Sequence, residues 1–468
     1  MKTLNDKDNA PSLAMWVIAF VLFAVIFASF CYDDTKSIIR YELGFAESML
    51  KGEFKDLYGA AYDTALYARE NNLGGGAFPA YSLPLNLLLG IWGIPLYLYR
   101  DFCGIHEDIT QSFAQVLYGK SILFIALIIT VILVYKICCT LGAKDSESKW
   151  GAYFYFTALI VTCSIGTIGQ CDVIGMILIL SGFLAYIRGE YKKFLLYFII
   201  AMPFKMYVFF LMFPLMLLRE KNIMRIIRNL IFIAVPTLLC DLSLINNPAA
   251  LRTKSLFNIA MLDKLTSLRL PLFHGRASVF VVLFGLLCVY CYLHDKHCEN
   301  ENKNFSLFIS IVSGVILFIS FPSYPYWIVY LVPYFAVACV CCSDKVNIIL
   351  FETTGFASLA FSNYLSYFWC YDIHNNVNMF LYRVFGNPEF REGALTLTRL
   401  ARSKLLHGTM RIFDAVFIVC MFTLVYLCSP ARDNNTNSIN YKQCAMTRLF
   451  INTLIAYIPV ILFFNAIG

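Results

Sequence analysis

The sequence predicts an all-α protein that crosses a membrane many times, and two observations lead to this prediction. Of the 468 residues, 59% are hydrophobic and only 14% are charged, which is typical of multi-helix membrane proteins rather than soluble domains. Apolar runs recur along the whole length, so we expect one transmembrane unit over residues 1–468 with about 11 to 13 spanning helices. The net charge of +7 fits cytoplasmic loops rich in Lys and Arg and does not suggest nucleic-acid binding.

The first predicted span is Ser12 to Cys31. It follows a short polar N-terminus and lacks a small-residue cleavage site, so we expect the protein to retain it. Two adjacent acids, Asp33 and Asp34, follow where the chain returns to water on the far side. Because like charges repel, a site that holds such a pair usually offsets them with a cation, a proton or a substrate. The alternative is a solvated helix end.

Residues 32–112 are predicted to form the first external loop, with helices that lie at the membrane surface. From Ile38 to Leu50, apolar side chains repeat at helical spacing and Arg40 falls elsewhere, which predicts an interfacial amphipathic helix. The apolar stretch Leu83 to Tyr99 is interrupted by Pro and Gly residues. We expect it to lie on, or dip into, the outer leaflet.

Residues 113–245 are predicted to form the core, and basic loops set its orientation. The loops next to Arg188 and Arg219 should both be cytoplasmic. The apolar stretch between them, residues 194–218, cannot be one span, because one span does not begin and end on the same side. We therefore predict two half-length helices that meet at a Pro-Phe-Lys apex, with Lys205 facing a cavity.

Residues 246–468 are predicted to alternate spans with external loops. Asn246 to Gly275 should be an external loop whose Arg252 and Lys254 depart from the positive-inside bias, which indicates a bound anion or lipid headgroups. The polar stretch Tyr371 to Met410 should also be external. The spans predicted after Arg228 are Leu230 to Leu244, Val279 to Leu293, Phe305 to Phe321, Trp327 to Cys342, Asn347 to Trp369, Ile412 to Cys428 and Leu449 to Phe464.

Several polar elements should converge on the outer face: the acid pair, Gln170 with Asp172, Lys205 and the basic loop. Acids beside cations suit a reaction in which a base removes a proton from an acceptor hydroxyl while cations stabilise a leaving phosphate. Simpler interpretations exist. Gln170 and Asp172 would cap the helix that follows, Lys205 would extend to the interface, and the aromatic residues Tyr324 and Tyr326 would form an interfacial belt.

Two other groups of residues are interpreted as structural. Most of the 17 cysteines lie inside apolar runs, where they act as small hydrophobic side chains. No CxxC pair has a matching CxxC or histidine pair, so the spacing does not favour a zinc or iron–sulfur site. The second group is the single residue Glu352, which lies inside an apolar segment near the predicted cytoplasmic end and is interpreted as structural.

The order and sidedness of these motifs resemble the GT-C superfamily of membrane glycosyltransferases, which use polyprenyl-phosphate-linked sugars. The resemblance is nearest to the aminoarabinose and protein-mannosyl transferase branch and to related bacterial mannosyltransferases. The matching motifs are Asp33-Asp34-Thr35-Lys36 with the helix after it, Gly169-Gln170-Cys171-Asp172, Met202-Pro203-Phe204-Lys205 through Pro214, and Ser323-Tyr324-Pro325-Tyr326-Trp327. In two places the sequence departs from the family: Phe78 stands where the aminoarabinose branch has a lysine, and Pro203 where threonine is usual.

The resemblance implies a GT-C-like fold and an inverting displacement with Asp33 as catalytic base and Asp34 as the close second candidate. The donor phosphate would bind near Lys205, with Arg252 and Lys254, and a divalent metal such as Mg²⁺ or Mn²⁺, where one is needed, at the acid pair. The substrate-binding residues would be Gln170, Asp172, Tyr324 and Tyr326.

The expected partners are a polyprenyl-phosphate-linked sugar donor, a glycan, lipid or protein acceptor, and membrane lipids, in a bacterial cytoplasmic membrane with the site facing outward. Two rival functions remain open at this point. One is a transporter or flippase of a lipid-linked or anionic substrate, which broken helices and an intramembrane lysine suit equally. The other is a lipid-linked glycan polymerase or ligase with a diphosphate donor.

Overall fold

The computed structural model describes residues 10–79, 81–272, 275–294, 299–321, 324–366, 391, 393–395, 399, 403–430 and 439–467. Over these residues the chain is helical apart from one antiparallel pair of strands, β1 (Arg269–Leu272) and β2 (Gly275–Ser278). The predicted all-α class is therefore confirmed, with this small sheet as the exception. The GT-C-like topology and the number of 11 to 13 spans stay predictions.

Within the described part of the chain, four helices are long and apolar enough to cross a membrane, as in an integral membrane protein. They are α5 (Phe113–Thr140), α11 (Ile223–Leu242), residues 303–320 of α14 (Glu299–Ser320) and residues 408–427 of α20 (Lys404–Leu427). The pair α21 (Tyr441–Ala456) and α22 (Ile458–Ala466), bent by 42°, would be a fifth. Shorter apolar helices include α1 (Leu13–Ser29), α8 (Asp172–Ile187), α10 (Tyr207–Arg219) and α13 (Val279–Leu293).

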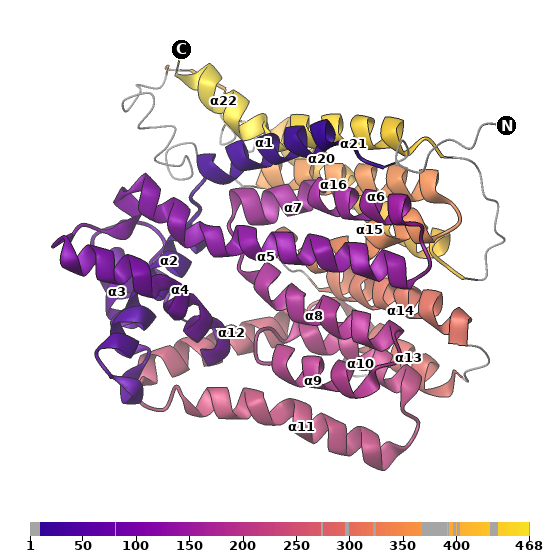
Figure 1. Cartoon of the computed structure of the whole chain (residues 1–468), viewed down its shortest axis with the longest axis horizontal. Coiled ribbons are helices and arrows are strands. Elements are labelled where there is room, and N and C mark those ends of the chain that lie inside the picture. The colour runs from indigo at the N-terminus through magenta and orange to yellow at the C-terminus, as the bar shows by residue number, and fades with distance from the viewer. Residues whose placement is uncertain are drawn as a thin grey trace.

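The remaining elements complete the bundle and one group beside it. They are α2 (Asp33–Leu50), η2 (Phe54–Asp56), α3 (Gly59–Glu70), α4 (Leu83–Phe102), η3 (Ile109–Gln111), α6 (Asp145–Phe156), α7 (Leu159–Val161), the π-helical turn η4 (Thr162–Thr167), α9 (Tyr191–Ala201), α12 (Pro248–Leu265), η5 (Pro325–Tyr330), α15 (Val332–Cys341) and α16 (Lys345–Ser366). Figure 1 shows α2, α3 and α4 together at one end, with α12 leading away from them.

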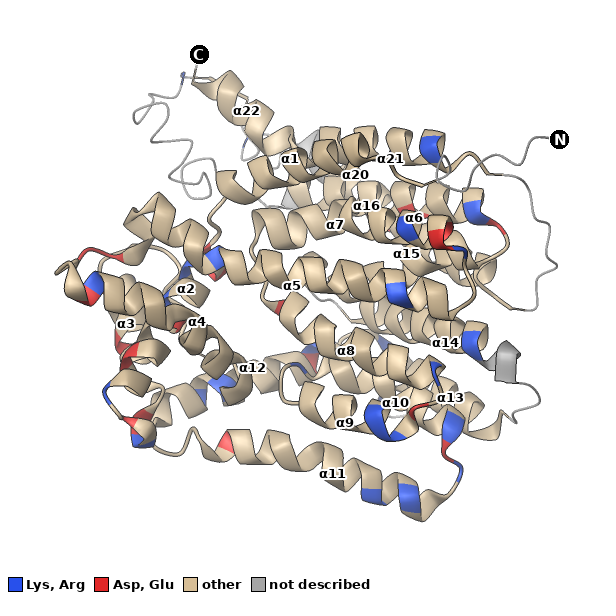
Figure 2. Cartoon of the chain, in the orientation of Figure 1, with Lys and Arg blue, Asp and Glu red and all other residues tan. Residues whose placement is uncertain are grey.

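Charged residues gather at the two ends of the bundle, and the long helices between them are largely without charge (Figure 2). The basic residues at the start of α11 lie at the end opposite the α2–α4 group. This distribution is what a bilayer selects, because a charge in its apolar centre is costly. The acid pair and the basic loop next to Arg219 thus lie at opposite ends, although their orientation in a membrane stays a prediction.

The predicted break in residues 194–218 is confirmed. The helices α9 and α10 meet at a turn of residues 202–206, and Pro203 in this turn has no N–H to continue the helical ladder. The prediction of Val279 to Leu293 coincides with α13. The predicted helix at Leu83 to Tyr99 is also present, as α4.

The prediction of an interfacial helix after the acid pair is wrong in one respect. α2 does form, but it is mostly buried inside the protein, with α4, α3 and α5 packed against it. Arg40 and Glu42, whose charges suggest a solvated face, are both 0% exposed. The amphipathic pattern identified the helix correctly, but protein rather than water covers the part of its polar face that carries Arg40 and Glu42.

Most of the predicted external loop from Asn246 to Gly275 is the helix α12, followed by β1. Its place outside the membrane stays a prediction. The Asn247 side chain accepts a hydrogen bond from the backbone N–H of Ala250 at 2.9 Å, and Pro248 occupies the first turn. Both are standard features of a helix start. Basic residues hid this helix, because they interrupt the apolar pattern of a span without opposing a helix.

Two predicted spans are interrupted in the structure. Trp327 to Cys342 is split into η5 and α15, and Leu449 to Phe464 is the bent pair of α21 and α22. Most of the predicted external stretch Tyr371 to Met410 lies outside the described residues.

Candidate functional site

A cavity of about 1390 Å³ is lined by residues of α2, α3, α12, η5 and the turn between α9 and α10. Its lining is mixed, and α12 itself contributes both apolar side chains, such as Leu256 and Phe257, and charged ones, Arg252 and Lys254. The structure brings together here most of the site residues inferred from the sequence, namely Asp34, Gln170, Lys205, Arg252, Lys254, Tyr324 and Tyr326. Their convergence required the chain to return to one place from segments far apart in the sequence.

The two acids of the pair have different surroundings. The Asp34 carboxylate lines the cavity and accepts hydrogen bonds from Gln170 Nε2 at 2.6 Å and from the Tyr326 hydroxyl at 3.3 Å. The Asp33 side chain is 49% exposed and forms an ion pair with Lys36, 3.4 Å away. Adjacent residues of a helix point about 100° apart, so only one of the two can face a given cavity wall.

The surroundings of Asp34 also change its proton affinity. Burial raises the pKa of Asp34 above its ordinary value, because loss of water penalises the charged carboxylate. Hydrogen bonds from Gln170 and Tyr326 and the charge of Lys205 act in the opposite direction but only reduce the rise. The result is a carboxylate that is held in place and accepts a proton more readily than an exposed one.

Lys205 lies where the sequence predicted, at the apex of the broken hairpin, and it has an acidic partner. Its ammonium is 2.9 Å from Asp172, the first residue of α8, whose side chain is 1% exposed. The same ammonium lies over the rings of Trp327 and Tyr81, at 5.2 and 5.3 Å from their centroids. Asp172 therefore both starts a helix and neutralises the lysine, so Lys205 is less free to bind a phosphate than predicted.

The other cations of the cavity fall into two kinds. Lys254 forms an ion pair with Asp241 of α11, so its charge is also compensated. Arg252 and Arg69 line the cavity, and within the described residues neither has an ion-pair partner. The Arg69 guanidinium lies 4.7 Å from the centroid of the Phe78 ring, which orients it. These two arginines are the better candidates for binding an anion.

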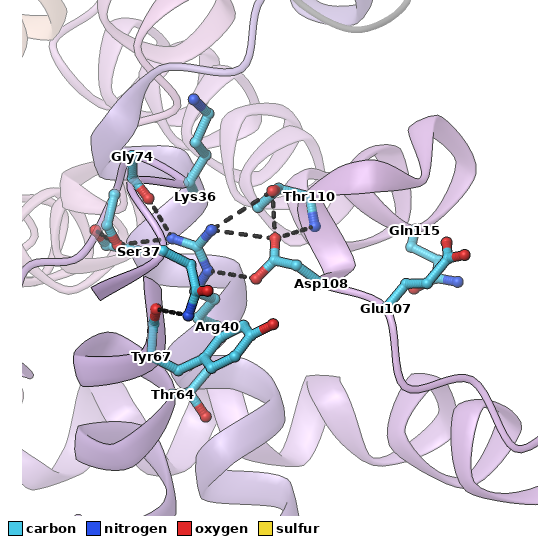
Figure 3. A network of polar contacts seen from close by, with 12 residues as sticks. Lys36, Ser37, Arg40, Thr64, Tyr67, Gly74, Glu107, Asp108, Thr110 and Gln115 are labelled. Atoms are coloured by element: carbon cyan, nitrogen blue, oxygen red, sulfur yellow. Dashed lines mark hydrogen bonds and ion pairs between the residues drawn. The ribbon is translucent and has the colours of Figure 1, made fainter. Parts of the chain in front are cut away.

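A buried ion pair fixes the segment between α3 and α4 beside the cavity (Figure 3). Arg40 contacts both carboxylate oxygens of Asp108, at 2.9 and 3.1 Å, and donates from Nη1 to the carbonyl of Gly75 at 2.9 Å. The Ser37 hydroxyl donates to the same carbonyl at 2.7 Å. Although burial raises the pKa of Asp108, hydrogen bonds from Arg40 and Thr110 lower it below its ordinary value.

The hydrogen bonds from Arg40 and Ser37 to the Gly75 carbonyl determine where the next residues of the segment lie. Tyr41 donates to the Ala77 carbonyl at 2.6 Å, and Phe78 stacks on Tyr62 with ring centroids 4.4 Å apart. Ala77, Phe78 and Tyr62 line the cavity. The polar face of α2 thus holds one wall of the site.

Sequence reasoning missed Arg69, Arg40 and Lys120. Lys120 lies inside the apolar run of α5, and a single ionisable residue in such a run is a sufficient reason to suspect a role. Arg40 and Arg69 gave no comparable signal, because in the sequence each looks like an ordinary charged residue on a helix surface.

The acid pair does not suit a divalent metal held by Asp33 and Asp34 together, since each carboxylate is engaged by a different partner, Lys36 for one and Gln170 for the other. Among the described residues, no group of three or more His, Cys, Asp and Glu side chains is arranged to hold a metal ion.

Comparison of the chain with models of known protein families and with curated proteins found no match.

Proposed function

We propose that the protein is a membrane glycosyltransferase that uses a lipid-linked sugar donor. More particularly, it is proposed to be of the GT-C type, moving one sugar from a polyprenyl phosphate to a cell-envelope acceptor at the outer face of the cytoplasmic membrane. One observation carries this proposal: the Asp34 carboxylate, held by Gln170 and Tyr326, lines a cavity that also contains Arg69 and Arg252.

In this proposal Asp34 is the general base. It takes the proton of an acceptor hydroxyl while that oxygen forms a bond to the anomeric carbon of the sugar. The bond between this carbon and the phosphate oxygen breaks on the opposite side, and its electron pair leaves with polyprenyl phosphate. A single displacement of this kind inverts the anomeric configuration. The raised pKa of Asp34 supports the assignment, because the base must bind a proton during the reaction.

The leaving phosphate needs a cation near the developing charge. Arg69 and Arg252 are proposed for this role rather than Lys205 and Lys254, which have Asp172 and Asp241 as partners. The polyprenyl chain would lie along α12, where Leu256, Phe257 and Leu262 are exposed. Lys205 would contribute positive charge to the cavity while Asp172 and two aromatic rings hold it in place.

The test is transfer by purified protein in proteoliposomes supplied with candidate polyprenyl-phosphate sugars and acceptors. We expect a covalent glycosylated product together with free polyprenyl phosphate. Full activity in a variant that carries both Asp33→Asn and Asp34→Asn would contradict the role of the acid pair. Release of a polyprenyl diphosphate instead would indicate the polymerase or ligase chemistry.

A second candidate is a transporter or flippase of a lipid-linked or anionic substrate. The broken hairpin α9–α10, with the buried pair Lys205 and Asp172 at its apex, favours it, because transporters often build substrate sites from interrupted helices. Net movement of substrate across the liposome membrane without a covalent product would support this candidate over the transferase.

A further inference from the structure

Lys120 is buried in the N-terminal third of an apolar helix, and its ammonium has three hydrogen-bond acceptors there. It belongs to α5, and its side chain is surrounded by protein. An ammonium carries three N–H donors. Three backbone carbonyls accept them: Phe27, Phe30 at 2.7 Å and Gly166 at 3.2 Å. The Phe27 ring lies beside the same ammonium, with its centroid 4.3 Å from Nζ.

The three carbonyls belong to two segments that each lead directly into the candidate site. Phe27 and Phe30 are at the C-terminal end of α1, where carbonyls lack partners within the helix and attract a cation. Gly166 is in the π-helical turn η4, a type of irregular turn often found at functional sites. The chain reaches Asp34 four residues after Phe30, and Gln170 four residues after Gly166.

Two further contacts connect η4 and the residue after it to α2 and to η5. The Thr35 hydroxyl donates to the Ile168 carbonyl at 2.6 Å, and the Ser164 hydroxyl donates to the Tyr326 carbonyl at 3.0 Å. At Gly169, whose φ is +70°, a Cβ atom would lie 2.2 Å from the Thr35 hydroxyl oxygen, so the close approach of the two segments requires glycine. We call Lys120, the end of α1 and η4 together the Lys120 junction. Through these contacts and the short stretches of chain that follow, the junction is connected to Asp34 and to its two hydrogen-bond donors, Gln170 and Tyr326.

We propose that Lys120 is a positioning residue that holds the end of α1 against η4 and thereby sets the hydrogen bond from Gln170 to Asp34. The inference rests on the proposed function in so far as it concerns catalysis. Without the ammonium, the three carbonyls lose their common donor, and the two segments are free to separate. Asp34 would stay in the cavity but away from its reacting position.

The first experiment compares Lys120→Met with the matched control Lys136→Met in the proteoliposome transfer assay. Lys136 lies on the same helix, but its side chain is exposed. A shift of about 1 Å in a reacting group costs roughly 100-fold in rate, so we expect kcat to fall about 100-fold in Lys120→Met with little change in the KM for donor. Lys136→Met should retain wild-type kinetics. An unchanged kcat in Lys120→Met would overturn the proposal.

The second experiment needs no activity and uses native cysteines as reporters. Cys31, Cys163 and Cys171 are buried within or next to the joined segments, whereas Cys339 is buried in α15. We expect N-ethylmaleimide to modify Cys31 and Cys163 faster in Lys120→Met than in wild type, as followed by peptide mass spectrometry, with Cys339 still protected. Equal acceleration at Cys339 would show general loosening of the fold and would overturn a local role for Lys120.

A milder variant, Thr35→Val, keeps the side-chain shape and removes only the bond to Ile168. It should lower kcat in the same sense, by less than Lys120→Met does, and an unchanged kcat in both variants would contradict the proposal. The two inferences can fail separately. Suppose that Lys120→Met speeds labelling only at Cys31 and Cys163, and that wild-type protein transfers no sugar. The structural role of Lys120 is then supported, and the proposed function is contradicted.

Discussion

Among the described residues that bury a cation with a carboxylate, two regions differ clearly in what surrounds the pair. Arg448 of α21 contacts both oxygens of Glu352 of α16, with Nε 2.8 Å from Oε2, and also donates to the Thr157 hydroxyl at 3.0 Å. Both side chains are almost completely enclosed, at 2% and 3% exposure. Lys205 and Asp172 form an equally close pair, but Lys205 faces the cavity.

The comparison separates structural charge from charge that is available for chemistry. Around Glu352, protein donors occupy both carboxylate oxygens. Around Asp34 and Lys205, one side of each group faces the cavity. Buried ion pairs are therefore a weak guide to function by themselves, and an adjoining cavity is the property that distinguishes the two regions.

The largest expected effect is on stability in the enclosed region. Glu352→Ala leaves Arg448 buried without its anion, and we expect the free energy of unfolding to fall by about 3–5 kcal/mol. Asp172→Ala leaves Lys205 beside a cavity that can hold water, so the loss should be below about 2 kcal/mol. Denaturation of both variants in the same detergent gives the comparison. A larger loss in Asp172→Ala would mean that the cavity pair is the structural one.

The next effect concerns the two arginines of the cavity. A hydrogen bond to a charged group contributes about 1.5–3 kcal/mol, so Arg69→Ala and Arg252→Ala should each lower kcat/KM for the donor about 10- to 100-fold. Lys254→Met is the matched control, because Asp241 already compensates that charge, and it should change kcat/KM less than about threefold. If Lys254→Met had the strongest effect, this would contradict the assignment to Arg69 and Arg252 and would favour a phosphate site at Lys205 and Lys254, as expected from the sequence.

A smaller effect is expected on the pH dependence of transfer. Asp34 must be unprotonated to act as a base, so activity should rise with pH through a pKa that burial places above the usual carboxyl value of about 3.9. The hydrogen bond from Gln170 lowers this pKa. Gln170→Ala should therefore move the acidic limb of the pH–rate profile to higher pH. A shift to lower pH would contradict this account of the Asp34 environment.

Much of the fold was predictable from the sequence, because the deciding signals are local. A proline and a lysine inside an apolar run identified the broken hairpin, and helical spacing identified α2. The sequence does not indicate which neighbouring segment covers a given helix face. Arg40 looks solvated in the sequence and is buried because Asp108, which is distant in the chain, meets it.

Most residues of the candidate site were predictable from the sequence, but their orientation was not. The acid pair, Gln170 and Lys205 were recognised as polar groups that share one face, and of these Asp34, Gln170 and Lys205 line one cavity. The choice between Asp33 and Asp34 depends on the rotation of α2 about its axis, which packing against α4 and α3 decides. The sequence resemblance favoured Asp33, whereas the structure places Asp34 at the cavity wall.

The most direct test of this account compares Asp34→Asn with Asp33→Asn in the transfer assay. Loss of a general base costs about 100- to 10,000-fold, so Asp34→Asn should lower kcat by that factor while the fold persists. Asp33→Asn removes only an exposed ion pair with Lys36 and should keep kcat within about threefold of wild type. The reverse result, in which Asp33→Asn is inactive and Asp34→Asn is active, would contradict the assignment of the base.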